Sequence, residues 1–246
     1  NYLYHHSNLY MIDIGQGDSF LLYDNYEAIL IDTGGIFKSK INQAEDILIP
    51  LFKSLGIKKI NKIIITHGDF DHLGNSYSLV ANFNVDKLYF NHNSYNKNEL
   101  RLIKKLKYKN IKYEKMSTIK TKNFYLKNLN YMNTEDENDA SLVINILYKN
   151  KTMLFTGDAS NKTEKYLLNN YNLKNIDILK VGHHGSITSS SEEFLKKIKP
   201  KIALISCALI NKFKHPSSEV IKRLKKYNVT LYQTRYDGGV NINLDS

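Results

Sequence analysis

The sequence is poor in the residues that hold small secreted folds together. Cys207 is the only cysteine among 246 residues, which excludes an internal disulfide bond and a zinc site built from several cysteines. No apolar run approaches the roughly 20 residues that a membrane-spanning helix needs, and no leader with a signal-peptide pattern is visible. Because the chain begins with Asn1 rather than Met, we expect a soluble domain taken from a larger protein.

Prolines and glycines are also few, at 3 and 12. No stretch rich in Pro, Gly or Ser divides the chain, and no repeat of solenoid period is present. Hydrophobic residues make up 42% of the sequence, so the chain can bury a sizeable core. We therefore expect residues 1–246 to form a single domain.

Acidic residues are outnumbered, with 24 Asp and Glu against 35 Lys and Arg, so the formal charge is +11. Such a charge favours a polyanionic partner, because basic side chains release counterions when they neutralise phosphates. A second explanation stays open. The basic residues are nearly all Lys, and an AT-rich genome would enrich Lys, Asn and Ile without any function attached.

Short apolar runs rich in β-branched and aromatic residues, bounded by Gly, Asn or Asp, predict β-strands. They lie at residues 9–14, 19–23, 28–32, 62–66, 141–148, 152–157, 177–181, 201–206 and 229–234. Helical periodicity is found at residues 44–56, 161–170, 191–199 and 217–227. Ser191 and Ser217 are suitable N-caps for the last two helices. The pattern predicts a mixed α/β domain.

A run of metal-type ligands follows one of the predicted strands. In "ITHGDFDHLGN", residues 65–75, the ligand types stand at His67, Asp69, Asp71 and His72. Neighbouring carboxylates repel one another unless a positive charge lies among them, and a divalent metal is the simplest such charge. Gly68 is expected to let the backbone turn tightly between the ligands. A polar turn with incidental histidines is the alternative, but four residues of metal-ligand type directly after an apolar strand favour a metal site.

Five further stretches carry a resemblance to a known family. They are "MIDIGQGDSFLL" (11–22), "LIDTGG" (30–35), "LFTGD" (154–158), "LKVGHHGSITSSSEEFL" (179–195) and "KHPSSEVIKRL" (214–224). Together with the run at 65–75 they resemble the metallo-β-lactamase fold hydrolases, and in particular the hydrolase domain of ComEC-type competence proteins, which import DNA during transformation. The resemblance covers about residues 9–243 and is weakest over 85–135. It implies an α/β fold of four layers, an αββα sandwich.

The resemblance also implies two divalent metal ions. The first would be bound by His67 and Asp69, the second by Asp71, His72 and His184, and both by Asp158. The sequence agrees with this, because Asp158 and the pair His183–His184 also follow apolar strands, whose ends can meet at one edge of the sheets. Which of His183 and His184 is the ligand stays open. Two such metals can activate a water that attacks a phosphodiester.

The sequence departs from the family pattern at the first metal. Asp69 stands where most members have a second histidine, and His92 is the only histidine between residues 72 and 158. Oxygen ligands or water are expected to take the vacant place, and candidate side chains stand at Glu137, Asn138 and Asp139. Oxygen-rich sites suit Mn²⁺ better than an all-imidazole zinc site does. We therefore expect Mn²⁺ as the working metal, with Zn²⁺ as the alternative.

Asp18, Ser19 and Asp32 lie in turns beside the first strands. The resemblance places all three near the metals. Asp18 would be a catalytic residue in contact with the activated water, and Ser19 and Asp32 would orient the ligands. Plain turn chemistry is the alternative, since Gly-Gln-Gly-Asp and Asp-Thr-Gly-Gly are both credible turns.

His183 and His215 are the other catalytic candidates. Adjacent residues rarely bind the same ion, so His183 is expected to face a phosphate or its leaving group. His215 precedes Pro216 at the start of a predicted helix. There it can donate a proton or a hydrogen bond to the phosphate, although an isolated histidine is more often a surface residue.

Residues 104–131 carry nine Lys and one Glu, interleaved with tyrosines. Lysines that neutralise phosphates beside aromatic rings that stack on bases are typical of single-strand binding. A solvated lysine-rich face is the alternative. The candidate DNA contacts are Lys104, Lys105, Lys107, Tyr108, Lys109 and Tyr113.

Together these features predict a metal-dependent deoxyribonuclease domain of a DNA-uptake protein. By the resemblance, it would degrade the strand that is not imported, on the outer side of the bacterial cell membrane and beside the channel portion of its parent protein. Single-stranded DNA is the expected partner, and no soluble protein partner is evident. The alternatives are a small-molecule phosphodiesterase, such as a choline-phosphate esterase, and a DNA-binding module with a degraded metal site.

Overall fold

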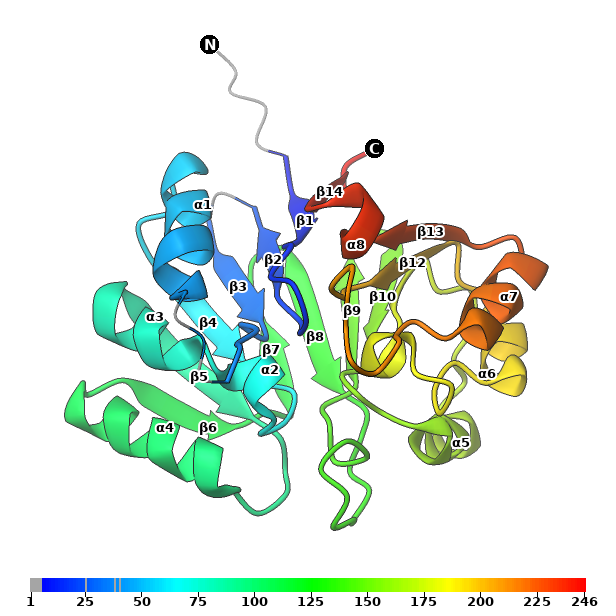
Figure 1. Cartoon of the computed structure of the whole chain (residues 1–246), viewed down its shortest axis with the longest axis horizontal. Coiled ribbons are helices and arrows are strands. Elements are labelled where there is room, and N and C mark those ends of the chain that lie inside the picture. Colours follow the sequence, from blue (N-terminus) through cyan, green and yellow to red (C-terminus); the bar gives the residue numbers. More distant parts are fainter. Residues whose placement is uncertain (1–5, 25, 38, 40) are drawn as a thin grey trace.

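Two seven-stranded sheets form the centre of the protein in a computed structural model that describes residues 6–24, 26–37, 39 and 41–246 (Figure 1). Across the first sheet the strands run in the order β14 (Val240–Asn243), β1 (Asn8–Met11), β2 (Phe20–Tyr23), β3 (Ala28–Ile31), β4 (Ile60–Ile64), β5 (Val85–Phe90) and β6 (Lys112–Lys115). Across the second they run in the order β13 (Thr230–Gln233), β12 (Ile202–Ile205), β11 (Ile178–Lys180), β10 (Lys151–Phe155), β9 (Ile144–Tyr148), β8 (Phe124–Asn128) and β7 (Thr118–Lys120).

Each sheet is antiparallel on one side and parallel on the other. Strands β3 to β6 are parallel in the first sheet, and β10 to β13 are parallel in the second. The chain passes from one sheet to the other between the edge strands β6 and β7. At its end it returns to the first sheet, where β14 pairs antiparallel with β1. Because neighbouring parallel strands run in the same direction, the loops that follow them lie at the same edge of each sheet.

Helices cover the outer face of each sheet (Figure 1). Those beside the first sheet are the π-helical turn η1 (Ala44–Leu48), α1 (Ile49–Ser54), α3 (Ser76–Asn82) and α4 (Lys97–Tyr108). Those beside the second are α5 (Asn161–Asn170), α6 (Glu192–Ile198) and α7 (Ser218–Lys226). The loops hold the short helices α2 (Phe70–Leu73), the 3₁₀ turn η2 (Gly182–Gly185) and α8 (Thr234–Asp237). None of the helices in the described part of the chain is long and apolar enough to span a bilayer.

Hydrophobic side chains pack in three separate clusters, as four stacked layers require. Phe20 and Phe155 meet edge to face between the two sheets, with ring centroids 5.1 Å apart. Phe52 lies in the cluster between the first sheet and its helices, and Phe194 lies in the matching cluster of the second sheet. The predicted αββα sandwich is thus confirmed.

The predicted strands and helices are all present, with ends within three residues of the expected ones. Ser191 and Ser217 cap α6 and α7 by accepting hydrogen bonds from backbone amides. The sequence did not predict α3, η2, α8, β14, or the elements from β5 to β8. Within this stretch, α4 begins with a capping box between Asn96 and Glu99. Because α4 contains many lysines, the apolar face that it buries was not recognised in the sequence.

Candidate metal centre

Polar side chains from both sheets gather at the carboxyl ends of the parallel strands. Asp32 follows β3, His67 follows β4, Asp158 follows β10 and His184 follows β11. The groups whose ligand atoms lie within 4.8 Å of one another are His67–His72–Asp158, Asp71–His72–His184, Asp18–Asp32–His72 and Asp18–Asp158–His184. Side chains that lie far apart in the sequence therefore meet at one edge of the sandwich.

His72 is fully buried and has a carboxylate at each ring nitrogen. Its Nδ1 lies 2.8 Å from Asp32 Oδ2, and its Nε2 lies 3.2 Å from Asp158 Oδ1. Asp32 is held in turn by the amide and hydroxyl of Thr66, which donate to it at 2.8 and 2.7 Å. A carboxylate on the outer nitrogen of a metal-binding histidine fixes the ring and its tautomer. Asp32 is therefore placed to orient the ring of His72.

His67 is oriented by a residue that the sequence analysis missed. The Thr66 hydroxyl lies 3.1 Å from His67 Nδ1. Since this hydroxyl donates to Asp32, it can accept from that nitrogen and leave Nε2 free to face the cluster. The rings of His67 and His72 lie 4.1 Å apart. The sequence feature that could have indicated this role is a threonine between the apolar strand and the first histidine.

His184 and His183 differ in the direction they face. His184 is buried, and its Nδ1 donates to the Ser206 carbonyl at 2.9 Å. Its Nε2 then points at Asp71, 3.4 Å away, and at Asp158, 3.7 Å away. Both histidines have left-handed backbones, with φ of 51° and 47°, a strained conformation that is concentrated at functional sites. The geometry favours His184 as the ligand, and the His183 side chain remains 28% exposed at the open side.

Lys180 is a second residue that the sequence analysis missed. It ends β11, is 1% exposed, forms an ion pair with Asp18 and lies 3.6 Å from Asp158 Oδ1. It also donates to the Gly157 carbonyl at 2.7 Å. Burial by itself would raise the pKa of Asp18, but Lys180 and His184 outweigh it and hold that pKa below its ordinary value. The signal was a single lysine within the apolar strand "DILKV".

Asp18 and Ser19 lie behind the ligands. Asp18 is 1% exposed, and its oxygens lie 3.4 Å from His184 Nδ1 and 3.8 Å from His72 Nδ1. These are the outer nitrogens of the two rings, so Asp18 is placed to orient ligands as much as to contact a water. The Ser19 hydroxyl donates to the Asp32 carbonyl at 3.4 Å. The turn before them packs closely on α2, because a Cβ at Gly17 would lie 2.2 Å from the Asp71 carbonyl oxygen.

The two aspartates of the run lie at the open side of the cluster. Asp71 is 32% exposed in its side chain. Burial would raise its pKa, but the nearby ring of His184 and the charge of His72 hold it well below its ordinary value. Asp69 is 50% exposed, with Oδ2 3.7 Å from His67 Nε2. It stays at the rim, outside the groups of converging ligand atoms.

Buried atoms that make no hydrogen bond indicate what this cluster is built to hold. Among the buried side-chain atoms of the described residues that make no hydrogen bond, four converge here, namely Nε2 of His67, His72 and His184 and Oδ1 of Asp158. Buried polar atoms are normally satisfied, so their convergence favours a cation among them. Imidazole nitrogen and carboxylate oxygen are both suitable ligands for Zn²⁺ and Mn²⁺. The residues present therefore fit a divalent metal.

Gly68 has a different role from the one expected. The chain bends at residues 66–68 as expected, but the backbone of Gly68 is not left-handed, so the bend by itself does not require glycine. A Cβ at this position would lie 2.0 Å from the side-chain amide of Asn96. The Glu137 carboxylate accepts hydrogen bonds from both the Gly68 amide and Asn96, at 2.6 and 3.0 Å. Glycine is needed here for close approach.

The other candidate oxygen ligands are mostly occupied. Asp139 accepts from the hydroxyls of Ser160 and Thr163 at 2.6 and 2.8 Å. His92 Nε2 lies 2.6 Å from the carbonyl oxygen of Met116. Of the three residues at 137–139, Asn138 alone has a buried side-chain oxygen without a hydrogen bond in the described part of the chain.

His183 and His215 lie together at the open side. Their ring centroids are 5.4 Å apart, and Phe213 stacks on His215 at 5.7 Å. Burial lowers the pKa of His215, and the neighbouring His183 adds to the effect. His215 is thus neutral near pH 7 and suited to hydrogen bonding. The sequence predicted the two histidines as separate candidates, and the structure places their rings side by side.

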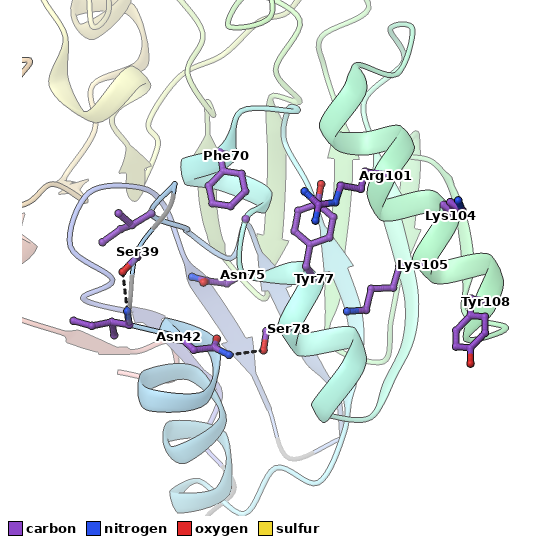
Figure 2. Close-up of a pocket in the computed structure, with 13 residues that line it drawn as sticks. Ser39, Asn42, Phe70, Asn75, Tyr77, Ser78, Arg101, Lys104, Lys105 and Tyr108 are labelled. Atoms are coloured by element: carbon purple, nitrogen blue, oxygen red, sulfur yellow. Dashed lines mark hydrogen bonds between the residues drawn. The ribbon is translucent and has the colours of Figure 1, made fainter.

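The six candidate DNA contacts do not share one surface. Those that line a groove beside α2 are Lys104, Lys105 and Tyr108 (Figure 2). Lys107 and Lys109 are exposed but lie outside that groove. Tyr113 is half-buried and packs edge to face on Phe90, with centroids 6.3 Å apart. Its ring is therefore poorly placed to stack on a base.

The fold and the cluster together define a class of protein, the metal-dependent hydrolases with an αββα sandwich. The chain belongs to the metallo-β-lactamase superfamily, whose family pattern matches residues 12–208. The family implies divalent metal binding, in agreement with the converging histidines and aspartates.

Three relatives indicate which branch of the superfamily is similar. The chain is 29% identical to ComE operon protein 3 of Bacillus subtilis, over 94% of this chain and 32% of that protein. It is 30% identical to Recombination protein 2 of Haemophilus influenzae, over 94% and 28%. It is 27% identical to Competence protein ComA of Neisseria gonorrhoeae, over 94% and 31%. The chain thus spans about a third of the length of these relatives.

A solved structure agrees on the fold. The metallo-β-lactamase fold protein YhfI from Bacillus subtilis superposes with a TM-score of 0.63. The superposition covers 96% of this chain and 99% of YhfI, and the two sequences are 12% identical. At that identity the likeness shows the fold alone.

Proposed function

We propose that this domain hydrolyses phosphodiester bonds of DNA with two divalent metal ions, Mn²⁺ in preference to Zn²⁺. The observation that carries the proposal is the convergence of the buried Nε2 atoms of His67, His72 and His184, which make no hydrogen bond, with Asp158 Oδ1. Two further findings support the proposal. The chain is similar to a protein named for competence, and its charge of +11 suits a phosphate-rich substrate.

Each group at the cluster has a place in such a reaction. Bound divalent ions would supply an activated water and positive charge for the phosphate oxygens. Asp32 and the Ser206 carbonyl hold the ligand histidines in orientation. His183 and His215, at the open side, would donate hydrogen bonds to the phosphate or to the leaving oxygen.

The biological setting is part of the proposal. The relatives are about three times as long as this chain. We infer that the domain acts beside a membrane channel portion of its parent protein, on the outer side of the bacterial membrane. There it would degrade the strand that is not imported. Single-stranded DNA would be its partner.

The two alternatives differ in what they predict for the cluster. A DNA-binding module with a degraded metal site would have no need of buried ligand atoms without partners. A small-molecule phosphodiesterase would use the same cluster and would have no need of the basic surface. The first alternative therefore conflicts with the geometry, and the second is separated by a substrate test.

The test is to incubate the domain with labelled single- and double-stranded DNA, with Mn²⁺, with Zn²⁺ and with a chelator. Mn²⁺-dependent cleavage of DNA is expected, and Asp71→Ala should abolish it. Asp71 is the better variant because its side chain is partly exposed, whereas His72 is fully buried and its loss is expected to disturb the fold. Cleavage that survives chelation, or turnover of small diesters but not of DNA, would contradict the proposal.

A further inference from the structure

A groove of about 610 Å³ lies beside α2 (Figure 2). Phe70 and Gly74 of this helical turn line the groove, whereas His72, between them, faces the metal cluster. The groove and the cluster therefore share α2. Since a helix with its side chains is only about 10 Å across, a chain bound at one can continue to the other.

One wall of the groove is basic. Arg101, Lys104, Lys105 and Tyr108 follow one another at helical spacing along a single face of α4. The other face of α4 is held in the core by Leu102 and by its apolar neighbours. In the described part of the chain no carboxylate pairs with Arg101, Lys104 or Lys105, and the described lining contains no Asp or Glu. Three uncompensated cations therefore face the groove.

The opposite wall carries apolar and aromatic side chains among the polar residues Ser39, Asn42 and Asn75. Ile36 and Ile41 are exposed, at 46% and 63%. The rings of Phe70 and Tyr77 stack with centroids 6.4 Å apart, and the Arg101 guanidinium lies 5.3 Å from the Tyr77 ring. Exposed apolar side chains opposite a row of free cations suit a ligand that is anionic along one edge and flat and apolar along the other.

We propose that the groove is the binding site for single-stranded DNA next to the cleaved phosphodiester. Arg101, Lys104 and Lys105 bind the phosphates, and the bases lie against Phe70 and the exposed ring of Tyr108. A single strand has both features, because its phosphates are charged and its bases are free to stack. A duplex keeps its bases stacked on one another and cannot use the apolar wall. This inference rests on the proposed function, in which DNA is the substrate.

The structure supplies a charge-matched control. Lys107, Lys109 and Lys112 belong to the same basic segment and are exposed, but none of them lines the groove. Substituting either set of three residues by alanine removes the same charge from the protein. The groove variant is Arg101→Ala with Lys104→Ala and Lys105→Ala, and the control variant is Lys107→Ala with Lys109→Ala and Lys112→Ala.

The experiment measures binding of a fluorescent 15-nucleotide oligo-dT by anisotropy, in EDTA and at several salt concentrations. The groove variant should bind at least about tenfold more weakly at low salt and lose up to about 0.7 log units of salt slope per phosphate contact. The control variant should bind like the wild type. Tyr108→Ala should weaken binding at least about fivefold, whereas Tyr125→Ala, on the exposed face of β8, should not. Circular dichroism checks that each variant is folded.

Equal losses in the two triple variants, or no loss in either, would overturn the groove assignment. An equal loss on a duplex of the same length would overturn the assignment to single strands. Because binding is measured without metal, these outcomes are independent of hydrolysis. Wild-type cleavage of DNA with Mn²⁺ is measured separately, and its absence would overturn the proposed function without deciding where DNA binds.

Discussion

The carboxylate of Asp32 lies 2.8 Å from Nδ1 of His72, and this contact turns the opposite nitrogen of the ring toward Asp158. Asp32 is itself fixed by two hydrogen bonds from Thr66. A buried carboxylate thus holds one ring nitrogen of His72, and the opposite nitrogen faces the cluster. Proteins orient metal-binding imidazoles by this arrangement.

Asp32→Asn should lower the affinity for the metal by about 10–100-fold, because the neutral amide no longer supports the ring as a carboxylate does. Asparagine also tolerates the left-handed φ of 55° at this position, so the fold should survive. Isothermal titration with Mn²⁺ measures the change, and Asp86→Asn, in a surface ion pair with Lys59, is the control. Wild-type affinity in Asp32→Asn would contradict the orienting role.

Asp69→His should shift the preference from Mn²⁺ toward Zn²⁺. The substitution replaces an oxygen ligand type with imidazole at the rim, where the exposed position leaves room for the ring. Competition between the two metals, followed by elemental analysis of the bound fraction, gives the ratio. If the wild type already retains Zn²⁺ over Mn²⁺, the reasoning about Asp69 is wrong.

Lys180→Met should destabilise the metal-free protein by about 3–5 kcal/mol, since it leaves the buried carboxylate of Asp18 without its cation. Urea unfolding in EDTA measures the loss. The double variant with Asp18→Asn should recover part of it, because the uncompensated charge is then gone. A loss below about 1 kcal/mol in the single variant would show that the ion pair contributes little.

Glu99 gives a pH dependence outside the metal cluster. Burial raises its pKa from 4.5 to about 7, and the carboxylate of Glu137 adds to the effect. Between these values the folded protein keeps a proton that the unfolded chain has lost, so this group makes stability fall as pH rises through that window, by up to about 3 kcal/mol. Above pH 7 its effect is constant.

Glu99→Gln removes this titration and can keep the capping box at the start of α4. The difference in unfolding free energy between the variant and the wild type should therefore grow in favour of the variant from pH 4.5 to 7. Urea unfolding at each pH measures it. A difference that stays constant over the window would mean that Glu99 titrates near its ordinary value in the folded protein.

Much of the fold could be predicted from local pattern. A fully buried strand such as β3, with the sequence AILI, is a short apolar run that fits few other structures, and Ser191 and Ser217 marked the starts of α6 and α7. The region of β5 to β8 was not predicted, because its exposed faces are rich in Lys and Asn. There the apolar positions are too widely spaced to give a clear period in the sequence.

The ligand types and their places at strand ends were determined by the sequence alone, because histidines and aspartates next to apolar strands are informative without coordinates. Which atoms meet was decided only by the tertiary structure. Lys180 is 162 residues from its partner Asp18, and Ser206 is 22 residues from His184. No local pattern predicts such pairs, since they depend on how the two sheets pack.

The same division applies to the basic surface. Its charge is determined by the sequence, but a row of lysines does not show which of them share a face with other elements. The helix α4 turns Lys104 and Lys105 toward the groove and leaves Lys107 outside it, because successive residues point in directions about 100° apart. The packing of α4 beside α2 and α3 then places the cations of this face opposite exposed apolar side chains, and this placement depends on the tertiary structure.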